Sequence, residues 1–125
     1  MIKGFEHITF ELTKDEMELL PTIIRGLTKK KGKANAVTST KICEALKIDA
    51  PRLRKMISYI RVNDLIFGLC SSSNGYYIAE TLTELDDCCI SLKQRIATQV
   101  KVLNSLEKQG IMFGGDGQTT LFEWK

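Results

Sequence analysis

The chain has 125 residues, 43% of them hydrophobic and 26% charged, a composition typical of a globular domain and not of an intrinsically disordered chain. Its longest apolar runs are a few residues long, so we expect no membrane-spanning segment, and the N-terminal stretch lacks the apolar core and cleavage site of a secretory signal. These features predict a cytoplasmic protein of about one domain.

The four cysteines and the single histidine do not form a metal-binding pattern. There is no CxxC pair, and His7 alone cannot complete a zinc site. Cys88 and Cys89 are adjacent, a spacing that does not suit a mutual disulfide. We therefore expect no metal and no cofactor, and we expect reduced cysteines, Cys43 and Cys70 included, that behave as small hydrophobic residues.

The net charge of +3 conceals an uneven distribution along the chain. Residues 25–61 hold eleven Lys and Arg against two acidic residues, a net charge of +9, whereas the remainder carries −6. A basic block of this kind predicts a surface suited to a polyanion such as nucleic acid.

The N-terminal part predicts a strand and then a helix. Apolar residues alternate over 5–12, which is the pattern of a strand. Thr13 and Glu16 have the spacing of a capping box, so a helix is expected over 14–28, bent or loosened by Pro21. A polar loop follows, and its four lysines are candidates for phosphate contacts: Lys29, Lys30, Lys31 and Lys33.

Two helices joined by a tight turn come next, after a very short extended piece. Thr38 or Ser39 can cap the first helix, which is expected to end near Lys47. Asp49 can cap the second helix, and Pro51 lies in its first turn, where a missing N–H costs little.

The second of these helices separates into an apolar and a basic side. At 100° per residue the core side is formed by Leu53, Met56, Ile57 and Ile60. The opposite side and its flanks hold the residues that could hydrogen-bond base edges and phosphates in a major groove: Arg52, Arg54, Lys55, Ser58, Tyr59 and Arg61. An ordinary solvated helix face is the alternative interpretation.

Two strands, 65–70 and 76–79, are predicted around a loop at 71–75. With them the sequence resembles the winged helix-turn-helix family, in particular small phage-type proteins. VTSTKICEALKI resembles the positioning helix, RLRKMISYIRVNDL the recognition helix, and NGYYIAETLTELDDC the returning wing strand and the helix after it. The resemblance covers 37–109 and implies that the recognition helix docks in a DNA groove while the wing touches the adjacent backbone.

The chain departs from this family in two respects. The turn has Lys47 where many relatives have glycine, so a left-handed backbone there would be strained. The wing, 65–79, contains no Lys or Arg, so its serines and Asn74 could donate to phosphates only without electrostatic gain. Winged helices also serve as protein-binding modules, which leaves an adaptor function open.

A long helix is expected over 82–109, opened by a second capping box of Thr81 and Glu84. Apolar residues recur along it at alternating spacings of four and three, with one polar member: Leu85, Cys89, Leu92, Ile96, Gln99, Leu103 and Leu106. This seam either packs across the small domain or pairs with a second copy of the chain, as a homodimer would.

The last segment, 110–125, is glycine-rich and is predicted to be a flexible tail. Its residues Gln118, Leu121 and Phe122 resemble the short peptide by which many bacterial and phage replication proteins dock on the sliding clamp. The alternative is that the apolar residues, Trp124 among them, fold back on the core as a closing strand.

The sequence thus predicts an α+β fold: a single winged helix-turn-helix domain at 1–109, with its core at 37–80. We expect it to bind double-stranded DNA in phage or mobile-element replication or transcription control, in a bacterial host cytoplasm. The alternative is a protein–protein adaptor on the same scaffold. An enzyme is not expected, because no nucleophile or phosphate-binding glycine motif is present.

Overall fold

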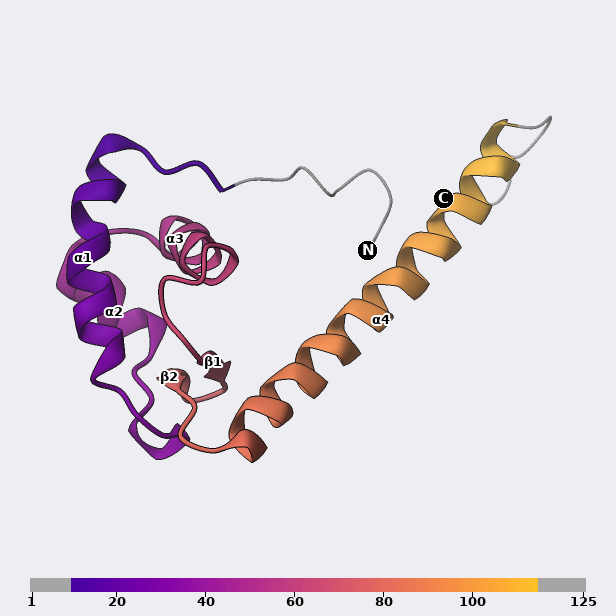
Figure 1. Cartoon of the computed structure of the whole chain (residues 1–125). Helices are drawn as coiled ribbons and strands as arrows, with labels where there is room; N and C mark the ends of the chain where they lie inside the picture. The colour runs from indigo at the N-terminus through magenta and orange to yellow at the C-terminus, as the bar shows by residue number, and fades with distance from the viewer. Residues whose placement is uncertain (1–9, 115–125) are drawn as a thin grey trace. The chain divides into compact units, whose positions relative to one another are not determined.

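The computed structural model describes residues 10–114 and has an α+β architecture, with four α-helices, one short 3₁₀ helix and a two-stranded antiparallel hairpin in that part of the chain (Figure 1). The elements are α1 (Lys14–Thr28), η1 (Lys33–Asn35), α2 (Ser39–Leu46), α3 (Ala50–Val62), β1 (Leu69–Ser72), β2 (Gly75–Ile78) and α4 (Leu82–Gly114). The chain divides into two compact units, residues 1–88 and 89–125, so that the boundary falls within α4. None of the described helices is both long and apolar enough to cross a membrane.

The capping box at the start of α1 is confirmed. The Thr13 hydroxyl accepts a hydrogen bond from the Glu16 amide at 3.2 Å, and the Glu16 carboxylate accepts one from the Thr13 amide at 2.8 Å. Helix α1 runs on through Pro21. Residues 10–12 have no regular structure, and the rest of the strand predicted over 5–12 lies outside the described residues.

The two predicted caps of the helix pair, Thr38 and Asp49, are also confirmed. The Thr38 side chain accepts from the Lys41 amide at 3.2 Å, and the Asp49 side chain from the Arg52 amide at 3.0 Å. Between the helices Lys47 adopts the left-handed conformation, with φ of 58°. This is the strained backbone that we expect where lysine replaces glycine in the turn. The tight turn is therefore formed without glycine.

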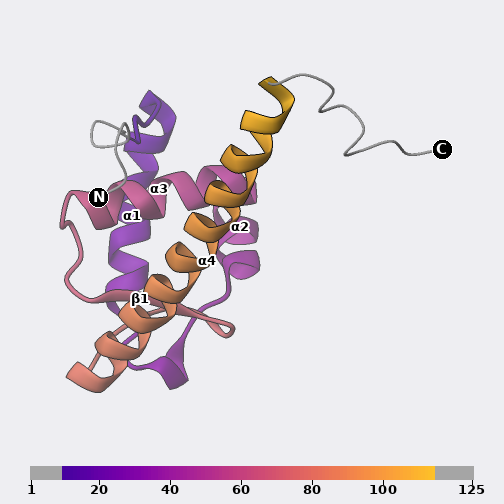
Figure 2. The same cartoon turned by 90° about the vertical axis from the view of Figure 1, so that its right-hand side faces the viewer.

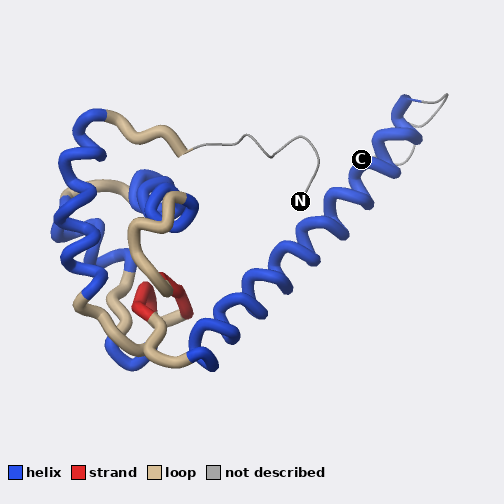
Figure 3. Tube along the Cα trace, viewed as in Figure 1, coloured by secondary structure: helices blue, strands red, loops and turns tan. Residues whose placement is uncertain are grey.

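The hairpin is shifted from its predicted position (Figure 3). The predicted strand 65–70 begins four residues late, because Asp64 and Gly68 have positive φ and fold the residues before β1 into turns. β1 then pairs with β2 as far as Ser72 opposite Gly75, so the loop is two residues long and not five. β1 extends to Ser72 and β2 ends at Ile78.

A third extended segment lies along the free edge of β2. Val37 and Tyr76 exchange backbone hydrogen bonds of 2.9 and 2.8 Å, as the short extended piece before α2 predicts. The Gly32 amide donates to the Ile78 carbonyl at 2.8 Å, and the Ile78 amide to the Lys30 carbonyl at 2.7 Å. The lysine loop is therefore fixed to the outer edge of the hairpin.

The core lies between α1, α3 and the start of the hairpin. All four core-side residues that the periodicity of α3 predicts are at most 2% exposed, and they pack with Leu20, Ile23 and Leu27 of α1 and Leu69 of β1. Each such side chain contributes about 1.5–3 kcal/mol by its removal from water. This packing fixes which side of α3 faces outward.

Helix α4 differs from its prediction at both ends. The Thr81 hydroxyl accepts from the Glu84 amide at 3.1 Å, but the Glu84 carboxylate accepts from the amides of Glu80 and Lys33 and does not close a capping box. These backbone N–H groups lower the pKa of Glu84. At the other end the helix runs to Gly114, so the prediction of a flexible tail from Gly110 is wrong for its first five residues.

The hairpin tip depends on one glycine. Gly75 has φ of 117°, and a Cβ there would overlap the carbonyl of Val37. We expect Gly75→Ala to destabilise the protein by about 1–3 kcal/mol in thermal or urea unfolding, because both the backbone and the third extended segment must shift. Gly26→Ala in α1 is the matched control: nothing lies near its Cβ, and it should stabilise by about 0.5–1 kcal/mol. Equal changes in the free energy of unfolding for Gly75→Ala and Gly26→Ala would contradict this role of Gly75.

Candidate nucleic-acid interface

A buried carboxylate joins α1 to the basic side of α3. Glu16 is 0% exposed, yet it is ionised between two cations. Its Oε2 lies 3.1 Å from Nε of Arg52, and its Oε1 lies 2.7 Å from Nζ of Lys55. The hydrogen bonds from Lys55 and from the Thr13 amide lower the pKa of Glu16 to about 2, against the opposing effect of burial.

Glu16 therefore has two roles, of which the sequence predicted one. Its spacing from Thr13 identifies the cap, but its partners lie 36 and 39 residues further along the chain. A signal was present: Glu16 shares the inward stripe of α1 with Leu20, Ile23 and Leu27 at intervals of four, three and four. A carboxylate on such a stripe requires a cationic partner from another element.

The six residues predicted to contact DNA from α3 differ in their exposure and in their partners within the protein. The side chains of Arg52 and Lys55 are 40% and 35% exposed and are held by Glu16. Ser58 and Tyr59 are half-buried, and Tyr59 packs against the core. Among the six predicted residues, Arg54 and Arg61 are the two classed as exposed.

Arg61 connects α3 to the hairpin. Its Nε donates to the Leu69 carbonyl at 3.2 Å, and a terminal nitrogen lies 3.4 Å from the Ser71 hydroxyl. The side chain thus fixes β1 against the C-terminal half of α3 while its charge remains at the surface.

The outer side of α3 is cationic even after the ion pairs are counted. Four cations on this helix, Arg52, Arg54, Lys55 and Arg61, are set against the single buried carboxylate of Glu16, which leaves a net charge of +3. The Glu16 carboxylate accepts a hydrogen bond from Nε of Arg52. The two terminal nitrogens of Arg52 have no acceptor within the described residues. The side chain can therefore hold its partner on α1 and still donate to an anion.

A hydroxyl-lined cleft lies between the start of α2 and the hairpin. Its volume is about 350 Å³, and its lining includes Thr38, Ser39, Thr40, Ser71, Ser72 and Ser73. This cleft supplies neutral hydrogen-bonding groups and no cation, in agreement with a wing that lacks Lys and Arg.

The lysine loop lies away from α3. It follows the C-terminal end of α1, whereas Glu16, which holds Arg52 and Lys55 of α3, lies near the N-terminal end. Figure 2 shows α3 crossing α1 partway along its length. The 15 residues of α1 correspond to about 22 Å. Lys29, Lys31 and Lys33 are exposed, and Lys30 is half-buried.

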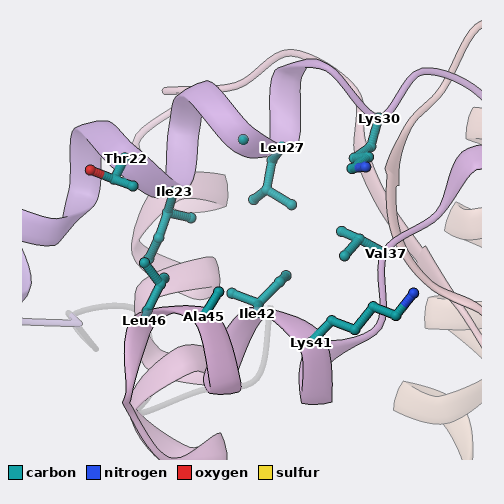
Figure 4. A pocket seen from close by; sticks show the side chains of 10 residues that line it. Thr22, Ile23, Leu27, Lys30, Val37, Lys41, Ile42, Ala45 and Leu46 are labelled. Atoms are coloured by element: carbon teal, nitrogen blue, oxygen red, sulfur yellow. The ribbon is translucent and has the colours of Figure 1, made fainter.

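An apolar pocket of about 340 Å³ opens between α1 and α2 (Figure 4). Aliphatic side chains, Leu27, Ile42 and Leu46 among them, line it, and Lys30 and Lys41 lie at one end. Because α1 and α2 form its walls, the pocket is separate from the cationic side of α3.

Residues 10–114 contain no cluster of three or more His, Cys, Asp or Glu that could hold a metal ion. The clamp-like residues Gln118, Leu121 and Phe122 lie outside the described residues, so the docking prediction stays a prediction. No protein-family model, no curated protein and no solved structure matches the chain.

The buried ion pairs give stability a defined pH dependence. Because the pKa of Glu16 falls on folding from 4.5 to about 2, its contribution is complete above pH 4.5 and is lost as the pH falls towards 2. We expect Glu16→Gln to lower stability by about 1–3 kcal/mol at neutral pH, because it leaves two partly buried cations without their anion.

Urea denaturation of both proteins between pH 2 and 7 measures the effect. The stability difference between wild type and Glu16→Gln should shrink as the pH falls below 4.5. Glu18→Gln, on the exposed side of the same helix, is the matched control and should change stability by less than about 0.5 kcal/mol. A difference that is independent of pH would show that the Glu16 charge does not stabilise the fold.

Proposed function

We propose that the protein is a non-enzymatic winged-helix protein that binds double-stranded DNA through α3. The order of elements supports this: α2, a tight turn, α3 and a hairpin, with Val37 in the position of a third strand beside β2. In this architecture the second helix of the pair enters the major groove, and the hairpin lies over the adjacent backbone.

The observation that carries the proposal is the net charge of +3 on the outer side of α3, held in a defined geometry. Glu16 fixes Arg52 and Lys55, and the hairpin fixes Arg61, so three of the four cations are positioned by other elements. Ordered side chains lose less conformational entropy when they bind phosphate. Arg54 and the hydroxyl of Ser58 lie between them and are candidates for contacts with base edges.

The hairpin has a different role in this proposal. It contributes the hydroxyl-lined cleft, whose Ser71, Ser72 and Ser73 can donate to phosphate oxygens without an ionic contribution. We therefore assign the salt-dependent part of binding to α3 and the shape-dependent part to the wing. We leave the lysine loop, which adjoins the outer edge of the hairpin at the C-terminal end of α1, outside the contact surface.

A second candidate function, a protein–protein adaptor, is favoured by one observation. The end of α3 and the turn that follows it expose three apolar side chains, Val62 at 61%, Leu65 at 42% and Phe67 at 92%. Such a patch on an otherwise polar surface suits a protein partner, as does a wing without cations. Duplex binding distinguishes the two candidates.

Gel shifts on duplex DNA over a range of salt concentrations test the proposal. Arg54→Gln removes one free cation, and we expect the salt slope to fall by about one. Glu16→Gln/Arg52→Gln/Lys55→Gln removes two cations together with their buried anion, so the fold keeps neutral partners and the slope should fall by about two.

The matched control is Lys29→Gln/Lys31→Gln/Lys33→Gln, which removes three exposed charges at the other end of α1. It should leave the slope unchanged. No binding of wild type at low salt would reject the DNA proposal in favour of the adaptor. A larger loss of slope in the loop variant than in the α3 variants would place the contact surface elsewhere.

A further inference from the structure

Helix α4 carries an apolar seam that no other described element of its own unit, which begins at Cys89, covers. The seam predicted from Leu85 to Leu106 is helical throughout, Leu82 lies at the position before it, and Gly110 occupies the position after it. Its central members are well exposed, with Leu92 at 50% and Leu103 at 40%. Of the fourteen large apolar side chains that are exposed among the described residues, ten belong to α4. A helix with such a stripe normally buries it against a partner.

We propose that a second copy of this chain covers the seam, as an antiparallel two-stranded coiled coil. The spacing of the seam residues, alternately three and four, is that of a heptad repeat. This inference concerns α4 alone and does not rest on DNA binding by α3.

The helix dipoles favour the antiparallel orientation. The charges near the two ends of α4 do not decide it, because at 100° per residue Asp87, Lys101 and Lys108 lie on the side of the helix away from the seam. An antiparallel pair places the positive N-terminal end of each helix dipole beside the negative C-terminal end of the other copy.

If the α4 helices of the two copies overlap along their full length, it is fixed which seam residue of one copy lies opposite which residue of the other. Cys89 then lies opposite the partner's Leu106, Leu92 opposite the partner's Leu103, and Ile96 opposite the partner's Gln99. Gln99, the one polar member, falls near the middle of the 33-residue helix, so the Gln99 side chains of the two copies lie in the two neighbouring layers on either side of the two-fold axis.

The contact comes up to the smallest area of a specific dimer only when the two helices overlap along their full length. A 33-residue helix is about 50 Å long, and a strip 10–12 Å wide along it covers about 500–600 Å² on each copy. The total of about 1,000–1,200 Å² reaches the lower end of the range for specific interfaces. A shorter, partly overlapping pairing would fall below it.

Sedimentation of the full chain tests the association. We expect a dimer for wild type and a monomer for Leu92→Lys/Leu103→Lys, because two seam charges would be buried in each helix. The matched control is Ile90→Lys/Ile111→Lys, two apolar residues that are exposed and lie off the seam; it should remain a dimer.

Circular dichroism checks that each variant keeps the fold of residues 10–88. A wild-type monomer at high micromolar concentration would overturn the proposal, as would a trimer or tetramer. A dimer that survives the seam substitutions, or that both pairs of substitutions abolish equally, would also overturn it.

Mild oxidation tests the orientation, in a Cys88→Ser background that leaves Cys89 as the cysteine of the seam. The antiparallel layers predict an interchain disulfide in Leu106→Cys, between Cys89 and the new thiol, identified by peptide mapping. Adding Cys89→Ser to that variant should abolish the crosslink. A disulfide between the two Cys89 residues without Leu106→Cys, or one that peptide mapping places between the two new thiols at position 106 after Cys89→Ser, would establish a parallel pair and overturn the proposal.

Discussion

A carboxylate that is buried away from water must have cations beside it, and the structure depends on this constraint. Glu16 is fully buried, and it meets that constraint with Arg52 and Lys55 of α3. The same carboxylate closes the cap of α1, so one side chain sets where α1 begins and how α3 is rotated against it. The buried charge of Glu16 and the apolar core side of α3 together set the orientation of the proposed DNA-binding helix.

The hairpin holds α3 from its other side. Arg61 donates to the carbonyl of Leu69, and β2 is closed on its outer edge by Val37. Glycine at position 75 lets that edge approach. Because α3 is fixed at both ends, its cations occupy defined positions, and this supports contact with a regular polyanion better than a set of freely moving lysines would. The lysine loop is fixed by backbone hydrogen bonds at the far end of α1, where it cannot share that geometry.

Local patterns in the sequence predicted the local structure. The caps at Thr13, Thr38 and Asp49 and the core side of α3 follow from spacings of a few residues, and all are confirmed. What the sequence did not predict depends on residues distant in the chain. The partners of Glu16 are 36 and 39 residues away, and Glu84 is paired with the amide of Lys33, 51 residues away. The late start of β1 arises from positive φ at Asp64, a backbone state that its residue type permits but does not require.

The central claim is that α3 forms the contact surface for duplex DNA. The most direct measurement is an NMR titration of the labelled protein with a short duplex, which follows each backbone amide. Binding through α3 should give the largest shifts at Arg52–Arg61 and at the serines of the hairpin, with small shifts in the lysine loop. Absence of shifts, or shifts centred on residues 29–33 or on the turn at Leu65 and Phe67, would contradict it.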